Sequence, residues 1–324
     1  MEVPDYGNCP VCNSSMQADP SSPGALRCPV CNFVQKPKSI IAPGYTVTNS
    51  VNANQYRILS NLSSGGFGDI FICHPIGDVS LRYVLKVLKN ATANNSKRFR
   101  REAEIIASIE DEDRIVKVLD FWEDGSEMFI VMEYIDGMNL KQVMSEYDVD
   151  EKTVLQVARE TAVALQHIWE RYSIIHRDIK PENIMLDKQW SLKILDFGLS
   201  KQCVEDGGSD ITMANSSLGT PGYMSPEQFT DSRNVDFRSD IFSLGATMFY
   251  LLTGKSPSGG DSLDQIYNDT LTNAPPPASK LEGKCSTGCI NLIQWMMQKN
   301  PDDRMGSYME LLDEIDQLLY SMPD

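Results

Sequence analysis

The order of its predicted elements constrains the fold of this 324-residue chain more than any other feature. Short apolar runs typical of strands follow Tyr56, and segments typical of helices dominate after Asn139. Strands followed by helices predict an α+β arrangement of two lobes. The strand-like runs are 56–62, 70–73, 81–88, 115–122 and 128–134, a helix is expected over about 96–109, and the later helices are expected over 152–172, 240–253, 286–298 and 308–320.

The N-terminal part of the chain differs in composition from the rest. Residues 1–36 are rich in Cys, Pro, Ser and Asn, and this segment is too short and polar to bury a core without a staple. Residues 37–55 repeat Pro, Gly, Asn, Ser and Thr without an amphipathic period, which is typical of a linker. The sequence therefore predicts an N-terminal module over 1–36, a linker over 37–55 and a larger domain over 56–324.

Four cysteines in the N-terminal module have the spacing of a metal site. Two Cys-Pro-Val-Cys segments are separated by 15 residues, and two such turns complete the tetrahedral thiolate shell of structural Zn²⁺. A redox-active thiol pair or an iron–sulfur centre is the alternative. The module has no net charge, so it lacks the basic surface of a nucleic-acid-binding zinc ribbon, and we expect it to bind a protein partner. The predicted zinc ligands are Cys9, Cys12, Cys28 and Cys31.

The acidic composition argues against nucleic acid as the main partner, because the formal net charge is −16 and phosphate-binding proteins concentrate Lys and Arg. No apolar run is long enough to span a bilayer, and the first residues lack the pattern of a signal peptide. We therefore expect a cytoplasmic protein without membrane association. The stretch 111–151 holds 13 acidic and 3 basic residues, and it is either a solvated face or a surface that attracts basic partners.

Two features of the first predicted lobe are typical of a phosphate site. The segment 63–69 is rich in glycine and lies between two predicted strands, where backbone amides could approach a phosphate, although a glycine-rich hairpin turn is common without one. Lys86 shares a strand face with Val84 and Leu88, so its burial requires a charged partner. Glu102 lies in the middle of the apolar stripe of helix 96–109 and is the expected partner, with a chance buried ion pair as the alternative.

A third cluster precedes a predicted hairpin of two short apolar runs, 184–186 and 192–195. Asn183 precedes the first run and Asp196 follows the second, so antiparallel pairing brings both side chains to the same end of the hairpin. Two neighbouring oxygen ligands suit Mg²⁺, which binds one or two carboxylates together with substrate phosphates. Asp178 comes five residues before Asn183 and is expected beside the same metal-bound phosphate.

Taken in this order, the motifs resemble those of the protein-kinase family over about residues 56–320. The matching segments include Val84-Leu85-Lys86, His176-Arg177-Asp178, Asp196-Phe197-Gly198 and residues 219–227. Lys180 and Thr220 resemble the serine/threonine-specific pattern, and residues 224–228 resemble bacterial kinases of the eukaryotic type. The resemblance implies a bilobal protein-kinase fold, with an antiparallel β-sheet N-lobe carrying one helix over about 56–135 and a mainly α-helical C-lobe over about 136–324.

The resemblance also implies an activity, the transfer of the γ-phosphate of ATP to protein serine and threonine hydroxyls with Mg²⁺ or Mn²⁺. Lys86, positioned by Glu102, would hold the α- and β-phosphates. Asp178 would orient the hydroxyl and accept its proton, with Lys180 near the γ-phosphate. Asn183 and Asp196 would carry the metal, and the nucleotide-binding positions would be Ser64, Gly65, Gly66, Phe67, Gly68, Ile70, Val84, Lys86, Met132, Glu133 and Ile135.

Two supporting contacts follow from the same resemblance. Glu227 is expected to pair with Arg304, and Asp240 is expected to brace the catalytic loop. The chain departs from the family pattern at two positions, where Ser63 replaces the first glycine of the loop and Val84 replaces the alanine before the lysine. These departures bear on nucleotide affinity, and they remove no residue with an implied catalytic role.

Arg177, just before Asp178, resembles kinases whose activation segment is ordered by phosphorylation. Thr212 is the favoured autophosphorylation site, with Ser216, Ser217 and Thr220 as further regulatory candidates, and the alternative is that these are ordinary polar residues of a loop. A pseudokinase scaffold that binds partners through the zinc ribbon is the rival function, and the complete set of implied catalytic residues argues against it. Because the acidic stretch 111–151 runs toward the peptide-binding side of such kinases, we expect a preference for basic substrate peptides.

Overall fold

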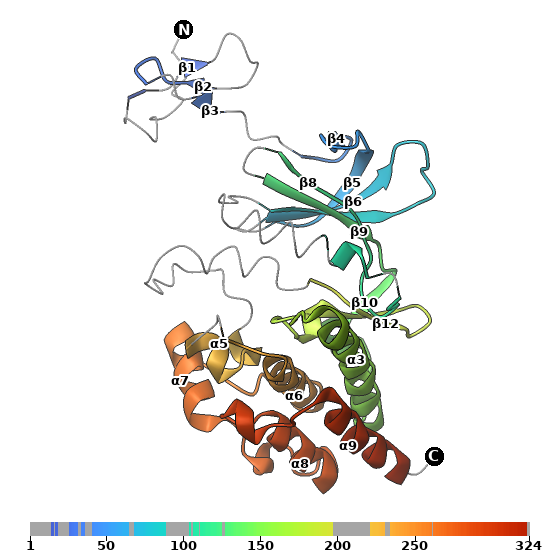
Figure 1. The fold of residues 1–324 in the computed structure, drawn as a ribbon, viewed down its shortest axis with the longest axis vertical. Coiled ribbons are helices and arrows are strands. Elements are labelled where there is room, and N and C mark those ends of the chain that lie inside the picture. The colour runs from blue at the N-terminus through green and yellow to red at the C-terminus, as the bar shows by residue number, and fades with distance from the viewer. Residues whose placement is uncertain are drawn as a thin grey trace.

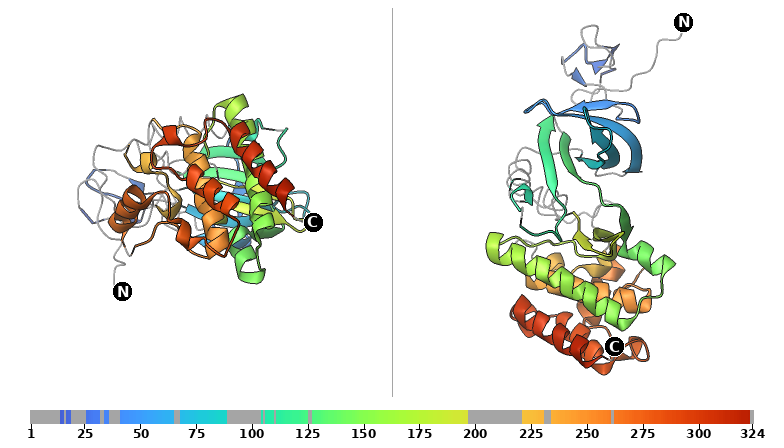
Figure 2. Two further views of the ribbon diagram at one scale, coloured as in Figure 1. Left: turned by 90° about the horizontal axis from the view of Figure 1, so that it is seen from below. Right: turned by 90° about the vertical axis from the view of Figure 1, so that its right-hand side faces the viewer.

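The structure is a computed structural model, and two lobes account for most of the chain (Figure 1). One lobe is built on a β-sheet and the other on helices, as the order of the sequence elements predicts. The right-hand view of Figure 2 shows the helices of the C-lobe gathered below the N-lobe sheet. The structure describes residues 14–15, 17–18, 26–31, 34–35, 41–64, 68–88, 104, 106–109, 111–124, 127–196, 221–230, 234–260 and 262–322.

The N-lobe contains one antiparallel sheet of six strands in the order β4-β5-β6-β7-β9-β8. Strands adjacent in sequence are adjacent in the sheet except at one edge, where β9 lies between β7 and β8. Register shifts interrupt the pairing of β5 with β6, and such bulges increase the local twist of a sheet. The strands are β4 (Thr46–Thr48), β5 (Gln55–Ser64), β6 (Gly68–Pro75), β7 (Tyr83–Leu88), β8 (Val118–Asp124) and β9 (Glu127–Glu133).

Strand β7 separates two hydrophobic clusters, because successive side chains of a strand point to opposite faces. Leu85 and Val87 belong to a cluster on one face of the sheet that includes Trp122. Leu88 and the partly buried Val84 belong to the cluster that continues into the C-lobe. Lys86 therefore shares its face with Val84 and Leu88, as predicted, and points toward the junction of the lobes.

Residues 41–55 of the predicted linker are attached to this sheet. Strand β4 pairs with β5, and Val47 belongs to the N-lobe cluster. The buried carboxylate of Asp120 on β8 accepts hydrogen bonds from four side chains of the adjoining segment, at 2.7 to 3.2 Å, and the donors are Asn49, Asn52, Asn54 and Tyr56. Composition predicts a linker here because an asparagine-rich segment lacks apolar periodicity. In the structure these asparagines are held by Asp120, a residue distant in sequence that no local pattern indicates.

The C-lobe is built around two helices that carry most of its buried surface. Helix α3 begins with Asp150 as its N-cap and ends at Ser173, whose φ of +55° is typical of a left-handed cap. Nearly every side chain of α6 is buried, so this helix forms the centre of the lobe. The helices are α2 (Leu140–Glu146), α3 (Glu151–Tyr172), α5 (Pro226–Thr230), α6 (Arg238–Thr253), α7 (Leu263–Asn273), α8 (Thr287–Met296) and α9 (Tyr308–Ser321).

The described residues also form two small sheets. One is antiparallel and lies at the junction of the lobes, with the order β10 (Gly137–Asn139), β11 (Ile184–Asp187) and β12 (Leu192–Ile194). The other belongs to the N-terminal module and consists of three two-residue strands, β1 (Gln17–Ala18), β2 (Leu26–Arg27) and β3 (Val34–Gln35). Across the described ranges, no helix combines the length and apolar character needed to cross a membrane.

Candidate active site

The hairpin of β11 and β12 brings Asn183 and Asp196 together, as predicted. Ile184 pairs with Ile194 in the antiparallel register, and the Leu195 N–H donates to the Asn183 carbonyl oxygen at 2.8 Å. The side chains that flank the two strands therefore lie at one end of the hairpin. Asp196 has a φ of +50°, an uncommon value for a non-glycine residue, so the surrounding contacts hold its backbone in this conformation.

The backbone of the preceding loop is held by the buried carboxylate of Asp240. Its Oδ2 accepts the His176 N–H and its Oδ1 accepts the Arg177 N–H, both at 2.7 Å. This confirms the prediction that Asp240 braces the loop. Arg177 has a φ of +65°, so these bonds fix a left-handed residue immediately before Asp178.

The ring of His176 links this loop to the end of β12. The Asp178 N–H donates to His176 Nδ1 at 3.3 Å, so Nδ1 is the acceptor and the proton is assigned to Nε2. Nε2 then donates to the Leu195 carbonyl oxygen at 2.8 Å. The fully buried imidazole therefore joins the backbone of Asp178 to the residue before Asp196.

The carboxylate of Asp178 receives two side-chain hydrogen bonds within its own loop. Its Oδ2 accepts Lys180 Nζ at 3.0 Å and Asn183 Nδ2 at 2.9 Å. Asn183 Nδ2 also donates to the Asp178 carbonyl oxygen at 2.8 Å. Because the amide nitrogen of Asn183 is used in this way, its Oδ1 is the atom of suitable chemistry for a cation.

Lys86 reaches across from the N-lobe to the same place. Its Nζ lies 2.7 Å from Asp196 Oδ1, and both side chains are partly buried. This ion pair joins β7 to the end of the hairpin. It places the ammonium group of Lys86, predicted to bind phosphate, next to the carboxylate of Asp196, predicted to bind the metal. Glu102, the expected partner of Lys86, lies outside the described residues. On the same predicted helix, Glu104 is exposed and Ile106 and Ile109 are buried.

Five of the predicted nucleotide-binding residues share one face of the N-lobe sheet in the register of its strands, namely Gly68, Ile70, Val84, Lys86 and Met132. A Cβ at Gly68 would meet the Val87 carbonyl oxygen at 2.1 Å, so the close approach of β6 to β7 requires glycine there. Ile70 faces Lys86 in the register of these strands, and Met132 is buried at the end of β9. The Glu133 N–H donates to the Lys117 carbonyl oxygen, and its side chain accepts from Lys193 Nζ at 2.9 Å. Gly65, Gly66 and Phe67 lie outside the described residues.

A buried ion pair supports the segment beyond the site. Arg304, whose side chain is 0% exposed, donates from Nη1 and Nη2 to the two carboxylate oxygens of Glu227 at 2.6 and 2.8 Å. This confirms the predicted pair, which anchors α5.

The phenol of Tyr223 is buried close to the catalytic loop. Burial, reinforced by the charge of Glu182, raises the pKa of this phenol well above its ordinary value, so the side chain stays neutral.

One polar contact to the catalytic loop was not foreseen from the sequence. Gln228 Nε2 donates to the Arg177 carbonyl oxygen at 3.0 Å. The run Ser225-Pro226-Glu227-Gln228 has the spacing of a capping box, which indicates the contact of Gln228 with Ser225 and not the one with Arg177. The regulatory candidates Thr212, Ser216, Ser217 and Thr220 lie outside the described residues.

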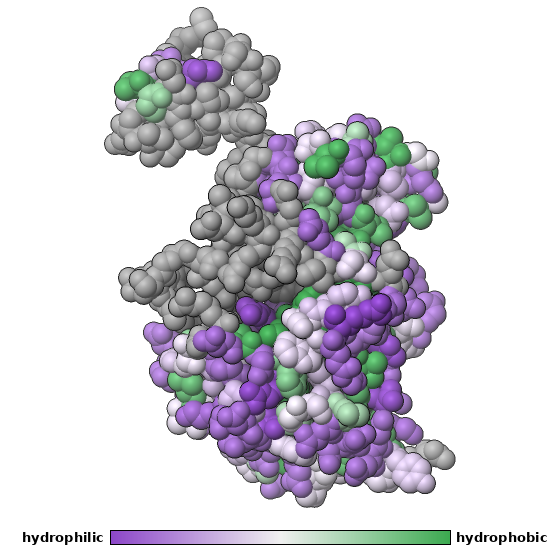
Figure 3. Space-filling model, viewed as in Figure 1, coloured by the Kyte–Doolittle hydropathy of each residue, from purple (hydrophilic) through white to green (hydrophobic). Residues whose placement is uncertain are grey.

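The arrangement combines the groups that phosphoryl transfer needs. Asp178 offers a carboxylate as proton acceptor, Lys86 and Lys180 offer positive charge, and Asn183 and Asp196 offer oxygen ligands. On the face shown in Figure 3, hydrophobic residues are visible at the junction of the lobes, whereas hydrophilic residues cover most of the C-lobe.

Comparisons with known proteins agree with this geometry. The serine/threonine-protein kinase pkn3 of Myxococcus xanthus is 35% identical over 268 residues, covering 79% of this chain and 48% of the relative. The serine/threonine-protein kinase PknB of Mycobacterium tuberculosis is 34% identical over 275 residues, covering 82% and 43%. This chain thus spans less than half the length of these relatives.

A solved structure, Rad53 1–466 in complex with AMP-PNP, superposes on this chain with a TM-score of 0.65 and 24% sequence identity. The match covers 80% of this chain and 64% of the solved chain, and it shows a likeness of fold. The family model described as the protein kinase domain matches residues 56–315. That match covers most of both lobes and every described residue of the site, and the chain therefore belongs to the protein kinase family.

Proposed function

We propose that this chain is an ATP-dependent serine/threonine protein kinase that transfers the γ-phosphate of ATP to hydroxyl groups of protein substrates. The observation that carries the proposal is the meeting of Lys86 and Asp196 from different lobes at 2.7 Å, beside the linked side chains of Asp178 and Asn183. The bacterial serine/threonine kinases among the relatives support the choice of hydroxyl substrate.

The mechanism follows from what each side chain offers. Asp178 accepts the proton of the substrate hydroxyl as its oxygen bonds to the γ-phosphorus and the bond from that phosphorus to ADP breaks. Lys180, bonded to Asp178 at 3.0 Å, lies where it neutralises charge on the transferred phosphoryl group. Lys86 would hold the α- and β-phosphates, with Glu102 as its proposed support.

The residues fit a divalent cation. Asp196 supplies a carboxylate, and Asn183 has its Oδ1 left for coordination because Nδ2 is bonded to Asp178. Mg²⁺ or Mn²⁺ bound there would neutralise phosphate charge. The adenine would bind below Val84, next to Met132 and the backbone of Glu133 and Ile135, and residues 64–70 would cover the phosphates.

The direct test is the transfer of labelled phosphate from ATP to a generic basic protein. Asp196→Asn should abolish transfer, because it removes the proposed charge at the metal site. Asp187→Asn makes the same change at the other end of the hairpin, where Oδ1 accepts the N–H groups of Gln189 and Ser191, and should retain activity. Equal phosphate transfer by the wild type and by Asp196→Asn would refute the proposal. A wild type that transfers no phosphate would favour the pseudokinase scaffold.

We also propose a preference for basic peptide substrates. Within the described residues, Glu182 accepts Lys141 Nζ at 3.0 Å through Oε1, whereas its Oε2 is buried without a hydrogen-bond partner. Glu182 lies between Lys180 and Asn183 beside the proposed base, and its side chain is 29% exposed, so its carboxylate can meet a cationic side chain of the substrate. The test compares basic and acidic peptides at low salt, where Glu182→Gln should reduce the preference. Equal turnover of both peptides by the wild type would contradict it.

The N-terminal module is proposed to be a zinc ribbon over 1–36 that binds a protein partner. Cys28 is 0% exposed in a segment whose strands have two residues each, and such a segment needs a staple. Within the described residues, no group of three or more candidate ligands is found, and Cys9 and Cys12 lie outside them. Metal analysis should find about one Zn²⁺ per chain, lost in Cys28→Ser and retained in Cys285→Ser. A zinc-free wild type would exclude the ribbon.

Autophosphorylation of the activation segment is proposed at Thr212, with Ser216, Ser217 and Thr220 as further candidates. The position of Arg177, directly before the proposed base, supports a role for it in binding the phosphate. Thr212→Ala should lower the activity reached after incubation with ATP, and full activation of this variant would exclude the site. The boundaries 1–36, 37–55 and 56–324 stay predictions, with residues 41–55 packed on the N-lobe as described above.

A further inference from the structure

Gln228 connects two parts of the kinase that must be aligned during phosphate transfer. Its side chain is 8% exposed and forms hydrogen bonds at both ends. The amide oxygen Oε1 accepts the Ser225 N–H at 3.0 Å and the Ser225 hydroxyl at 3.3 Å. The amide nitrogen Nε2 donates to the Arg177 carbonyl oxygen at 3.0 Å.

The peptide group that Gln228 contacts belongs to the proposed base. The Arg177 carbonyl and the Asp178 N–H are the two halves of one peptide bond, which is planar and therefore moves as a unit. Gln228 holds the carbonyl side, and His176 Nδ1 holds the N–H side at 3.3 Å. Arg177 has a φ of +65°, and such a conformation persists only when its surroundings determine it.

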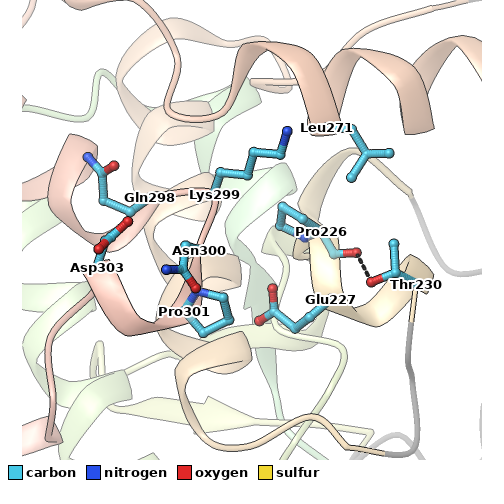
Figure 4. Close-up of a pocket in the computed structure, with 9 residues that line it drawn as sticks. All are labelled: Pro226, Glu227, Thr230, Leu271, Gln298, Lys299, Asn300, Pro301 and Asp303. Atoms are coloured by element: carbon cyan, nitrogen blue, oxygen red, sulfur yellow. Dashed lines mark hydrogen bonds between the residues drawn. The ribbon is translucent and has the colours of Figure 1, made fainter.

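The backbone N–H groups of this stretch are held by Asp240 of α6 and by His176 of the loop itself, whereas Gln228 comes from the segment 221–230. That segment directly follows the proposed regulatory residues Thr212, Ser216, Ser217 and Thr220 in sequence, and Ser225 at the start of α5 is fully buried. Figure 4 shows that Pro226, Glu227 and Thr230 of α5 line a pocket of about 510 Å³ together with Leu271 and residues between 298 and 303. Glu227 is bound by Arg304, so α5 is fixed through one residue and reaches the catalytic loop through the next.

We propose that Gln228 is a positioning residue, which transmits the placement of the segment 221–225 to the catalytic base Asp178 through the Arg177 carbonyl. The inference rests on the proposed kinase activity and extends it to the control of that site. The required chemistry is specific to glutamine, because one end must accept from Ser225 and the other must donate to a carbonyl oxygen.

This requirement separates the proposed role from helix capping. Gln228 is the third residue after Ser225, and in a capping box that position accepts the N–H of the cap residue, a task that glutamate performs equally well. Gln228→Glu therefore keeps the acceptor for Ser225 but sets a carboxylate oxygen against the Arg177 carbonyl. The chain offers a matched control in Gln142, which accepts the Asn139 N–H at 2.9 Å in the capping box of α2 and is exposed.

The experiment measures kcat and the KM for ATP of the wild type, Gln228→Glu, Gln228→Ala and Gln142→Glu, together with thermal unfolding. Gln228→Glu should lower kcat about tenfold or more while the KM for ATP changes less than about twofold, because the base is displaced and Lys86 is not. Gln228→Ala should also lower kcat, and it introduces no charge, so it serves if the glutamate variant folds poorly. Gln142→Glu should match the wild type.

A second readout does not depend on activity. Amide hydrogen exchange of the peptide covering 174–180 should accelerate in Gln228→Glu and stay unchanged in Gln142→Glu. If Gln228→Ala impairs kcat but Gln228→Glu does not, the residue is only a helix cap and the inference is overturned. Unchanged kcat and unchanged exchange in both Gln228 variants overturn it as well. A wild-type chain that transfers no phosphate refutes the proposed kinase activity itself. The exchange measurement is still informative in that case, because unchanged exchange of residues 174–180 in Gln228→Glu would show that Gln228 does not position the loop.

Discussion

Replacing Asp120 with alanine removes the acceptor of four hydrogen bonds that attach residues 49–56 to strand β8. The donors differ in burial. Asn49 and Tyr56 are 1% and 5% exposed, whereas Asn52 and Asn54 are exposed and can bond to water instead. Only the two buried donors are left unsatisfied by the substitution.

Each buried donor without an acceptor costs about 1–3 kcal/mol, so Asp120→Ala should lower the free energy of unfolding by about 2–6 kcal/mol. At the centre of that range, about 4 kcal/mol, the Tm of a domain of this size should fall by about 8–16 °C. Tyr56→Phe removes a single donor and should cost about 1–2 kcal/mol. The ring of Tyr56 stacks on Trp122 in either case, with centroids 6.1 Å apart.

Calorimetry or denaturant unfolding of the whole chain measures these differences. The matched control is Asp124→Ala, which removes the same charge from an exposed position on the same strand and should change stability by less than about 0.5 kcal/mol. If Asp120→Ala unfolds at the same temperature as Asp124→Ala, the attachment of residues 49–56 to the N-lobe through Asp120 is wrong.

Three further predictions concern burial and charge. Arg304→Ala should destabilise the chain by about 3–5 kcal/mol in urea unfolding, because it leaves the Glu227 carboxylate unpaired, and a change below about 1 kcal/mol would contradict the role given to the pair. Burial alone would raise the pKa of Asp236, but hydrogen bonds from Arg238 outweigh it and lower the pKa. The ionised carboxylate therefore stabilises the fold at any pH above its unfolded pKa near 3.9. This stabilisation is lost as the pH falls through the lower pKa of the folded state. The stability gap between the wild type and Asp236→Asn should therefore be full at pH 7 and shrink below about pH 4, and a gap that widens on acidification would contradict that sign. Burial raises the pKa of the Cys73 thiol to about 12, so iodoacetamide at pH 8 should leave Cys73 unmodified in the folded chain and alkylate it in urea, as mass spectrometry would show.

Local patterns were sufficient to predict much of the fold. The order of apolar runs predicts strands within a few residues of β5, β6, β7 and β9, and helices close to α3, α6, α8 and α9. Helices α2, α5 and α7 were not predicted. Helix α2 has seven residues, too few for a clear period, and in α7 polar residues interrupt the apolar positions.

The candidate site was predictable where two residues are joined by a local element. Asn183 and Asp196 flank one hairpin, so antiparallel pairing alone brings them together. The contact of Lys86 with Asp196 joins residues 110 positions apart, and only the packing of the lobes determines it. The contact of Gln228 with Arg177 crosses 51 positions and ends on a backbone carbonyl, so no side-chain pattern indicates it.

The measurement that tests the central claim most directly is the rate of phosphate transfer by Asp178→Asn beside the wild type, with ATP affinity measured separately. Asparagine keeps an oxygen to accept from Lys180 and Asn183 but cannot take the hydroxyl proton. The expected result is a loss of about 10²–10⁴-fold in kcat with nearly unchanged ATP affinity. Transfer at the wild-type rate by Asp178→Asn would contradict the assignment of Asp178 as the base of a phosphate-transfer site.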